Sequence, residues 1–274
     1  MTVEERMQLI QKHFQEGKEL AATENSIENL ATLIDKYPLE TRSIITEGAS
    51  MQAALKSLQE KDSLSGWLSF YSKIGVKFSS QAHVGVGWAL AELNLSINPY
   101  TSLIDRENHW RILDGYGYYF ALFKRRIVLR QQEFPSQLSK NQEGFYTQGI
   151  GRCLWYLAKG DVSKLESTIN ILKTPFLSDL WRGIGIAVSY IGLINDAELE
   201  HLKTLAKDHV TSFLCGTLIA ASSSVKSGCN TSESIDIVKR LFIDSDLLIK
   251  QLITFEQEHK GEGFYAFKKT LLLH

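Results

Sequence analysis

The chain has 274 residues, of which 44% are hydrophobic and 22% are charged, and its formal net charge is −1. This composition is ordinary for a globular protein with a sizeable core, and the balanced charge argues against nucleic-acid binding, which usually needs a basic surplus. No apolar run reaches the roughly 18 residues of a membrane span, and the N-terminal segment lacks an apolar signal core, so we expect a cytoplasmic protein.

Two helices are expected at the start of the chain, near residues 3–22 and 26–36, and residues 1–40 should cap one end of the fold. Beyond them, glycines recur at intervals of 30 to 37 residues, and four of these begin a Gly-x-Gly pair followed by an apolar run. The recurring positions are Gly48, Gly85, Gly115, Gly149, Gly183 and Gly216. A period near 34 residues is typical of helical-hairpin repeats.

The sequence between successive glycines favours a helical hairpin in each repeat. In the unit GIGRCLWYLAKGDVSKLESTINILKTP, an apolar helix precedes a turn at Gly160-Asp161 and a second helix with Leu165 and Ile169 on one face. The next two units repeat this order of helix, turn and amphipathic helix, and the first of them has its turn at Asn195-Asp196. The four prolines all fall between predicted helices, where they break no helical hydrogen bond, and no stretch shows the alternation of a strand.

The glycine pairs admit two explanations. In HVGVGWALAEL, Gly85 and Gly87 look like the start of a phosphate-binding loop, but that fingerprint needs a preceding strand and an acidic residue about 20 positions later. KFSSQAHV is a poor strand, and four such loops in one chain would make no sense. Because glycine costs about 1 kcal/mol in a helix, its recurrence there indicates close approach of another backbone. We therefore expect the glycines inside helices, at contacts between helices.

These patterns predict an all-α fold. Tandem helical hairpins of about 34 residues, similar to TPR or HEAT repeats, should form a short right-handed solenoid. We expect a single domain over residues 1–274, with the repeats in residues 41–245 and closing helices in residues 246–274. The last of these should include HKGEGFYAFKKTLLLH.

Five motifs in the same order also suggest a family. EGASMQAAL, HVGVGWALAEL, DGYGYYFALF, QGIGRCLWYL and DLWRGIGIAVSYIGL together resemble the bacterial DUF1702 family over residues 40–220. The resemblance implies a place in biosynthetic gene clusters for enediynes and other polyketides. It supplies no reaction that could be transferred to this chain.

Polar residues beside the glycines, together with nearby aromatic rings, are the candidate site residues. They should lie on the surface formed by the first helix of each hairpin, the usual binding face of such arrays. Histidine titrates near neutral pH, a carboxylate can orient it or supply a proton, and arginine can hold an anionic oxygen. The candidate catalytic residues are His83, Asp114 and Arg152, and Glu47 belongs to the same polar stripe. The candidate ligand-binding residues are Trp88, Tyr116, Tyr118, Gln148, Trp155, Trp181 and Arg182.

Two interpretations of this stripe stay open. It could line a groove for an apolar or polyene ligand, in which case at least three of its five central polar residues should share one cavity. Those five are His83, Asp114, Gln148, Arg152 and Arg182. Alternatively, the charged residues form ion pairs between repeats and the aromatic rings belong to the ordinary core.

Other residues suggest weaker sites. His109-Trp110-Arg111 in DRENHWRIL is expected at the surface, and the basic run FKRRIVLR could dock an acidic carrier protein. The three cysteines lack metal-ligand spacing and are expected to be buried free thiols. No nucleotide-binding or metalloenzyme motif is present, so we expect neither a cofactor nor a metal.

Two functions from different classes follow. The first is an accessory protein of polyketide-type specialised metabolism that binds a hydrophobic intermediate, free or carrier-bound, or the carrier or synthase that delivers it. The alternative is an acid–base enzyme, a cyclase, isomerase or lyase, acting on a polyketide or isoprenoid chain. The absence of a nucleophile, metal or nucleotide motif favours the first.

Overall fold

The computed structural model describes residues 1–229 and 232–258, and every regular element in these ranges is helical, as predicted. The α-helices are α1 (Val3–Thr23), α2 (Ile27–Ile34), α3 (Leu39–Gln59), α4 (Ser65–Lys73), α5 (Ser79–Glu92), α6 (His109–Phe123), α7 (Lys140–Leu157), α8 (Val162–Ile169), α9 (Leu177–Ile191), α10 (Asp196–Ala206), α11 (Val210–Ser227), α12 (Ser232–Leu241) and α13 (Ser245–Glu258). Shorter 3-10 or π segments are η1 (Gly75–Phe78), η2 (Asn98–Leu103), η3 (Arg106–Asn108), η4 (Arg126–Gln131) and η5 (Lys207–His209). No helix in the described part of the chain is both long and apolar enough to cross a membrane.

Polar caps fix where several helices begin. Thr2 and Glu5 form a reciprocal capping box at the start of α1, and Asn195 and Glu198 form another at the start of α10. Such caps satisfy amide groups that have no partner within the helix and are worth about 1 kcal/mol each. The turn expected before α10 is therefore confirmed.

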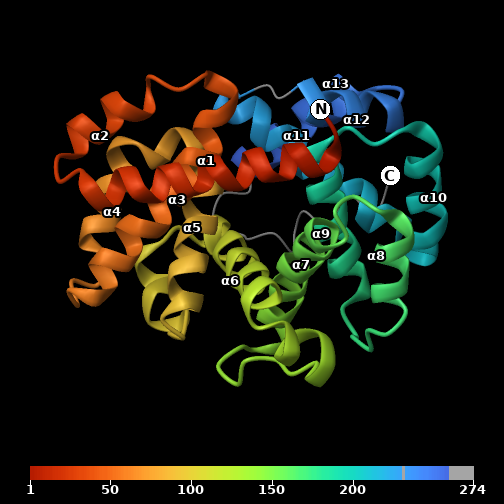
Figure 1. The fold of residues 1–274 in the computed structure, drawn as a ribbon, viewed down its shortest axis with the longest axis horizontal. Coiled ribbons are helices and arrows are strands. Elements are labelled where there is room, and N and C mark those ends of the chain that lie inside the picture. Colours follow the sequence, from red (N-terminus) through yellow and green to blue (C-terminus); the bar gives the residue numbers. More distant parts are fainter. Residues whose placement is uncertain (230–231, 259–274) are drawn as a thin grey trace.

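Long helices pack side by side in chain order, from α1 through α3, α5, α6, α7 and α9 to α11 (Figure 1). The glycine pairs make this packing close, because the two glycines of a pair face opposite neighbours. A Cβ on Gly149 of α7 would lie closer than 3.0 Å to the backbone of Asp114 on α6, and one on Gly151 would collide with Leu180 on α9. The predicted role of the glycines as helix–helix contacts is confirmed.

Short helices follow only some of the long ones. In the C-terminal half, α8, α10 and α12 follow α7, α9 and α11, in the order that the sequence predicts. Between α5 and α7, however, the connections hold η2, η3 and the π-helical η4 in place of a second α-helix. Pro99 lies in the first turn of η2, and Gln132 adopts a left-handed conformation after η4, so neither connection continues as an α-helix. A regular solenoid of 34-residue hairpins is not confirmed.

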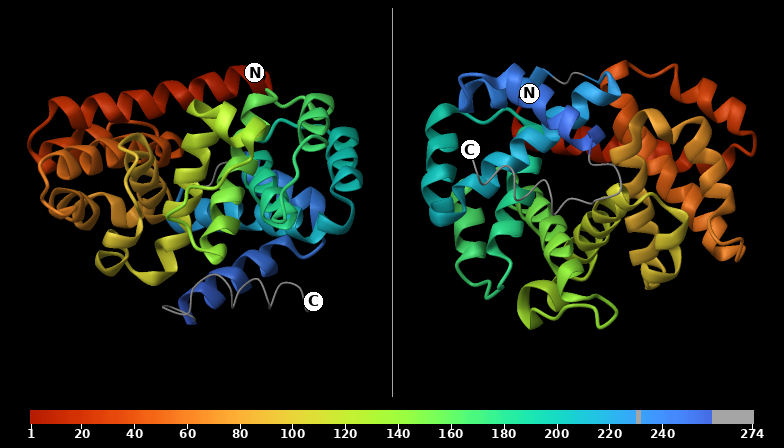
Figure 2. Two further views of the ribbon diagram at one scale, coloured as in Figure 1. Left: turned by 90° about the horizontal axis from the view of Figure 1, so that it is seen from below. Right: turned by 180° about the vertical axis from the view of Figure 1, so that it is seen from behind.

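The row of helices turns about a common centre, and α1 runs across it (Figures 1 and 2). Gln11 of α1 accepts a hydrogen bond of 2.7 Å from Tyr156 of α7, and Arg6 pairs with Glu233 of α12 at 2.9 Å. On α3, Ser43 contacts Tyr190 of α9 at 3.4 Å. The first helix therefore does more than cap one end, since it joins early and late parts of the row.

Other expectations concern single residue types and the C-terminus. All three cysteines are buried free thiols, as predicted, and no proline lies inside an α-helix. The expected closing region begins with α13, but HKGEGFYAFKKTLLLH lies outside the described residues.

Candidate functional site

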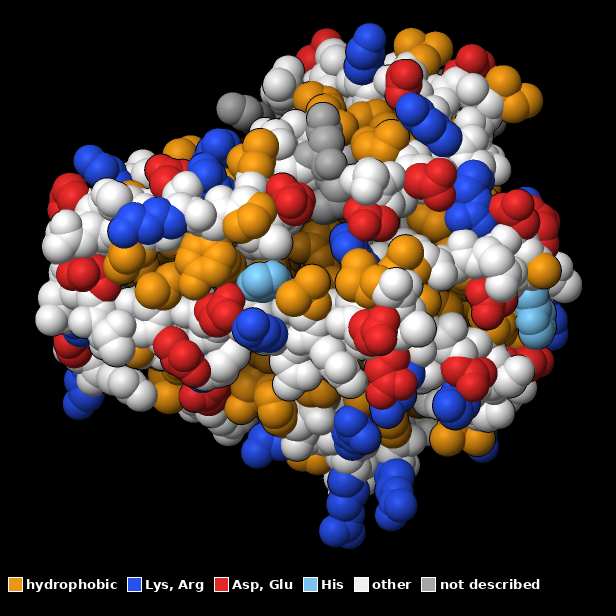
Figure 3. Space-filling view, turned by 45° about the horizontal axis from the view of Figure 1, so that its top comes forward, with side chains coloured by type: hydrophobic (Ala, Val, Ile, Leu, Met, Phe, Trp, Pro, Cys, Tyr) orange, Lys and Arg blue, Asp and Glu red, His pale blue; other side chains and the backbone are white. Residues whose placement is uncertain are grey.

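A cavity of about 650 Å³ lies at the centre of the helix row, lined by residues of α1, α3, α5, α6, α7, α9 and α11. On α5 its wall runs from Ser80 to Glu92, which corresponds to a length of about 18 Å at the rise of an α-helix. Most of the lining side chains are aliphatic or aromatic, such as Ile10, Phe14, Ile44, Met51, Trp88 and Ile219. On the face drawn in Figure 3, hydrophobic side chains gather in a hollow with charged groups at its rim. The cavity is therefore long and predominantly apolar.

Asp114 and Arg152 form an ion pair in the cavity wall. The Asp114 side chain is 2% exposed, and its two oxygens accept hydrogen bonds from Arg152 Nη1 and, at 2.6 Å, from Gln148 Nε2. Burial alone would lower the pKa of Arg152, but Asp114 and Glu47 outweigh burial and raise that pKa above its ordinary value. Arg152 is consequently a fixed positive charge in an apolar surrounding.

Glu47 of α3 lines the same cavity but has no such partner. The residue is 5% exposed, and no hydrogen bond or ion pair joins its carboxyl group to any residue of the described ranges. Burial raises the pKa of Glu47 to about 7, partly opposed by Arg152 and reinforced by Asp114. At neutral pH this carboxyl group can therefore both hold and release a proton.

Aromatic rings form the wall beside these charges. The Arg152 guanidinium lies 5.2 Å from the centre of the Tyr118 ring, and Trp88 packs against Tyr118 and Phe14 with ring centres 5.1 and 4.9 Å apart. Burial raises the pKa of Tyr118 well above its ordinary value, so its phenol stays neutral. Two lining residues, Gln81 and Trp88, also bury a polar atom that has no hydrogen-bond partner within the described ranges.

Gln148 and Arg182 lie behind the cavity wall. Arg182 of α9 donates to Gln148 of α7, which in turn donates to Asp114 of α6. Arg182 also pairs with Asp179 at 2.5 Å. Gln148 and Arg182 thus each donate to a side chain of the preceding helix, and neither of them lines the cavity.

His83 faces another region of the core. Its Nδ1–H donates to the carbonyl oxygen of Ser79 at 2.7 Å, and its ring packs against Trp67 and Tyr71. Burial lowers the pKa of His83 to about 3, although the bond to Ser79 opposes the shift. Among the five central polar residues only Asp114 and Arg152 line the cavity, so the expectation of at least three is wrong.

Only some of the predicted aromatic residues line the cavity. Trp88 and Tyr118 line the cavity, whereas Tyr116, Trp155 and Trp181 are buried between helices. The hydroxyl of Tyr116 accepts a hydrogen bond of 3.0 Å from Gln137. For these three rings the interpretation as ordinary core fits the structure better.

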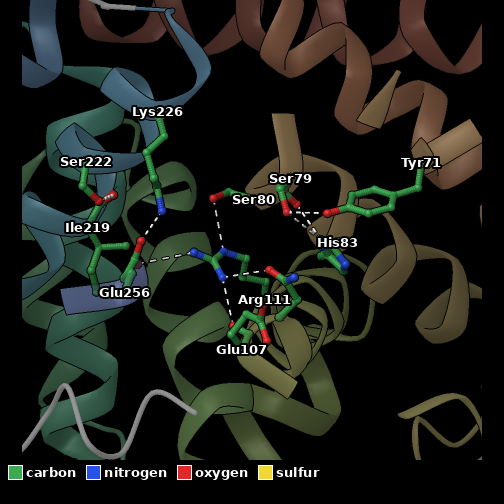
Figure 4. Close-up of polar contacts among 11 residues, drawn as sticks. Tyr71, Ser79, Ser80, His83, Glu107, Arg111, Ile219, Ser222, Lys226 and Glu256 are labelled. Atoms are coloured by element: carbon green, nitrogen blue, oxygen red, sulfur yellow. Dashed lines mark hydrogen bonds and ion pairs between the residues drawn. The ribbon is translucent and has the colours of Figure 1, made fainter. Parts of the chain in front are cut away.

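A second chamber of about 470 Å³ adjoins the cavity at the N-terminal ends of α5 and α6. Both spaces are lined by Ser80, Trp110 and Arg111, so these residues lie at the boundary between the two spaces. Glu256 of α13 interacts here with Arg111 and with Lys226 of α11 (Figure 4). Arg111 was expected at the surface, but its side chain is only 9% exposed.

The sequence contains a signal for Arg111, which the prediction missed, and Glu47 belongs to the predicted polar stripe. Arg111 precedes Asp114 by three residues and so shares its helix face, and Glu47 stands directly before Gly48 as Asp114 stands before Gly115. Within residues 1–229 and 232–258, no group of three or more His, Cys, Asp or Glu side chains is placed to bind a metal ion.

Comparisons with known proteins give a family but no closer relative. A search of curated proteins and a search of solved structures each found no match. A family model described as "Protein of unknown function (DUF1702)" matches residues 1–257, nearly the whole chain. The chain therefore belongs to the DUF1702 family.

Proposed function

We propose that this protein binds a hydrophobic small molecule in the central cavity, as an accessory protein of polyketide-type specialised metabolism. The observation that carries the proposal is the Glu47 carboxyl group, which has no hydrogen-bond or ion-pair partner among the described residues and lies in a largely apolar cavity of about 650 Å³. Native proteins leave few buried polar groups unpaired, so such a group favours a ligand that completes its hydrogen bonds. The volume also falls within the range of about 300–1,000 Å³ usual for small-molecule sites.

The shape and polarity of the cavity restrict the ligand. A wall about 18 Å long favours an extended apolar chain. Glu47 and Arg152 favour an oxygen atom partway along that chain, since a protonated carboxyl group and a guanidinium both donate hydrogen bonds. A polyketide intermediate, free or delivered by a carrier protein or synthase, has this combination of apolar chain and internal oxygen atoms.

A fluorescent apolar dye tests the proposal directly. N-phenylnaphthylamine should bind the purified protein with increased emission, and dodecanol should displace it. Ala187→Phe should reduce dye binding at least about tenfold, because Ala187 is 7% exposed and lines the cavity. Ala22→Phe on the exposed side of α1 is the matched control and should bind like the wild type. Thermal melting identifies any loss of folding, and equal binding by a folded Ala187→Phe would refute the proposal.

An acid–base enzyme remains the second candidate function. Its acid–base residue would be Glu47, which lines the cavity, and not His83, which does not. A carboxyl group with a pKa near neutrality is suited to general acid–base chemistry. If the protein is catalytic, cells that carry Glu47→Gln should accumulate a precursor and lose its product in mass spectra, while the purified variant still binds the dye. If it only binds, Glu47→Gln should leave the metabolite pattern unchanged.

We also infer that the long helices descend from repeated hairpins. The recurrence of glycines and the alternation of long and short helices from α7 to α12 support this history. The connections between α5 and α7 would then be repeats whose second helix was lost.

A further inference from the structure

Several contacts hold Arg111 in place at the boundary between the two chambers. Its guanidinium lies 4.4 Å from the centre of the Trp110 ring and donates to Ser80 Oγ at 3.2 Å and Asn108 Oδ1 at 2.9 Å. A further bond of 3.0 Å runs to the backbone carbonyl oxygen of Glu107 (Figure 4). All three of these acceptors are uncharged, so they orient the guanidinium without neutralising it.

Two cations share one carboxylate at this junction. Glu256 lies 3.5 Å from Arg111 Nη2 and also pairs with Lys226 (Figure 4). No other ion pair reaches Arg111 or Lys226 from residues 1–229 and 232–258, although Asp105 and Glu107 line the outer chamber. Among the described residues, one positive charge at the junction is therefore not matched by a paired carboxylate.

Glu256 is the more replaceable partner. Its side chain is 23% exposed, and it comes from the last turn of α13, whereas Arg111 is held by three hydrogen bonds and by Trp110. An arginine can donate hydrogen bonds to the carboxylate or phosphate oxygens of a ligand in place of a side-chain carboxylate, because its N–H groups match the geometry of those oxygens.

We propose that Arg111 and Lys226 bind the anionic head group, a carboxylate or a phosphate, of an amphipathic ligand whose apolar chain occupies the central cavity. Glu256 fills the head-group position in the structure and is displaced by the incoming oxygens. This inference rests on the proposed function, because it requires the cavity to accept an apolar chain. It adds the ligand class, an acid with a long chain, and the end of the cavity at which the acid lies.

Three probes of equal chain length separate the head group from the chain. Dodecanol, dodecanoate and dodecyl phosphate, each below its micelle-forming concentration, are titrated against the protein loaded with N-phenylnaphthylamine. The two acids should displace the dye about fivefold more effectively than the alcohol, the factor expected of a partly exposed ion pair. The relative strength of the two acids identifies the head group as carboxylate or phosphate.

Charge variants assign this preference to the junction. Lys226→Met should abolish most of the advantage that the two acids have over dodecanol in displacing the dye. Glu256→Gln should increase that advantage about fivefold, because it removes the competing carboxylate. Dodecanol displacement should stay unchanged in both variants. Lys164→Met on α8 removes one positive charge from a side chain that is 65% exposed and lines neither space, so it should behave like the wild type.

The displacement experiments distinguish failure of the head-group site from failure of the proposed function. If dodecanol displaces the dye but the acids are no better, the head-group site is refuted while the proposed function stands. Equal tightening of acids and alcohol by Glu256→Gln would also refute it, because the effect would then come from a wider opening. If neither the dye nor dodecanol binds, the proposed function itself fails.

Discussion

Two carboxyl groups lie near the guanidinium of Arg152, but their surroundings differ. Asp114 accepts hydrogen bonds from Arg152 and Gln148, whereas no described residue donates one to Glu47. Desolvation of the Glu47 carboxylate is therefore uncompensated by hydrogen bonds, and burial raises its pKa to about 7. A pair of acids with unlike surroundings allows one to hold charge while the other holds a proton.

Glu47 should make the folded protein less stable as the pH rises from about 4.5 to about 7. Across this range the unfolded carboxyl group loses its proton while the folded one retains it, so increasing pH favours unfolding. The difference between these pKa values corresponds to about 3 kcal/mol of unfolding free energy. The unfolding free energies of the wild type and Glu47→Gln can be measured with urea near pH 4 and near pH 8. The difference between the two proteins should change by about this amount from one pH to the other.

The comparison between variants isolates Glu47 from the other titrating groups. His83 changes stability in the opposite direction at low pH, but it is present in both proteins and cancels in the difference. Glu40→Gln, at an exposed position of α3, is the control. Its unfolding free energy should differ from that of the wild type by nearly the same amount at both pH values. A constant difference for Glu47→Gln as well would mean that folding does not shift the pKa of Glu47, contrary to the expectation.

At the scale of the elements, glycine pairs set the spacing of the helices. Gly115 of α6 packs on the backbone of Val84 in α5, and Gly117 packs on the backbone of Tyr146 in α7. Contacts of this kind bring two backbones together at a point where any side chain would force them apart. The pairs thereby position Asp114 and Arg152 as well as the helices that carry them.

Gly149→Ala should destabilise the protein more than Gly144→Ala, although both lie in α7. Alanine improves helix propensity by about 1 kcal/mol at either site. A Cβ at position 149, however, meets the backbone of Asp114, while the nearest atoms to one at position 144 belong to the Asp179 side chain. Overpacking against backbone should reverse the gain and leave a net loss of about 2 kcal/mol in urea unfolding. Equal effects at both positions would show that the helices can separate without cost.

Much of this arrangement could be predicted from the sequence, because it depends on local patterns. The 34-residue recurrence placed the glycines within helices, Gly160-Asp161 lies directly before α8, and Asn195-Asp196 lies where α10 begins, as expected. The connections between α5 and α7 escaped prediction, since a proline or a left-handed residue stops a helix without determining what replaces it.

The candidate site was only partly predictable, because a shared register does not determine which way a side chain points. Asp114, Gln148 and Arg182 all stand directly before a glycine pair, yet only Asp114 lines the cavity. The longer Gln148 and Arg182 side chains reach the preceding helix and are satisfied there. His83 stands two residues before its glycine, and the change of one position along a helix turns its side chain away by about 100°.

At the scale of the whole molecule, the cavity exists because the helix row curves and α1 crosses it. Ile10 and Phe14 of α1 supply part of the cavity wall, together with residues of α9 and α11. Gly17 of α1 packs on the backbone of Ile45 in α3, which fixes one half of the helix. The other half is held by contacts such as the pairing of Arg6 with Glu233 on α12. The enclosure of the cavity therefore depends on contacts between segments more than 200 residues apart in the chain.

Arg6→Met should loosen the first half of α1 without unfolding the rest of the protein. The Arg6 and Glu233 side chains are 15% and 23% exposed, and removing such a pair should cost about 1 kcal/mol, or about fivefold in local opening. Hydrogen exchange followed by mass spectrometry should show faster exchange in the N-terminal half of α1 and unchanged exchange in α6 and α7. Lys12→Met, which removes a charge 68% exposed on the same helix, should leave the exchange of α1 unaltered. Uniformly faster exchange in α1, α6 and α7 would contradict a local role, whereas loosening confined to α1, with weaker dye binding, would identify this helix as the movable wall of the cavity.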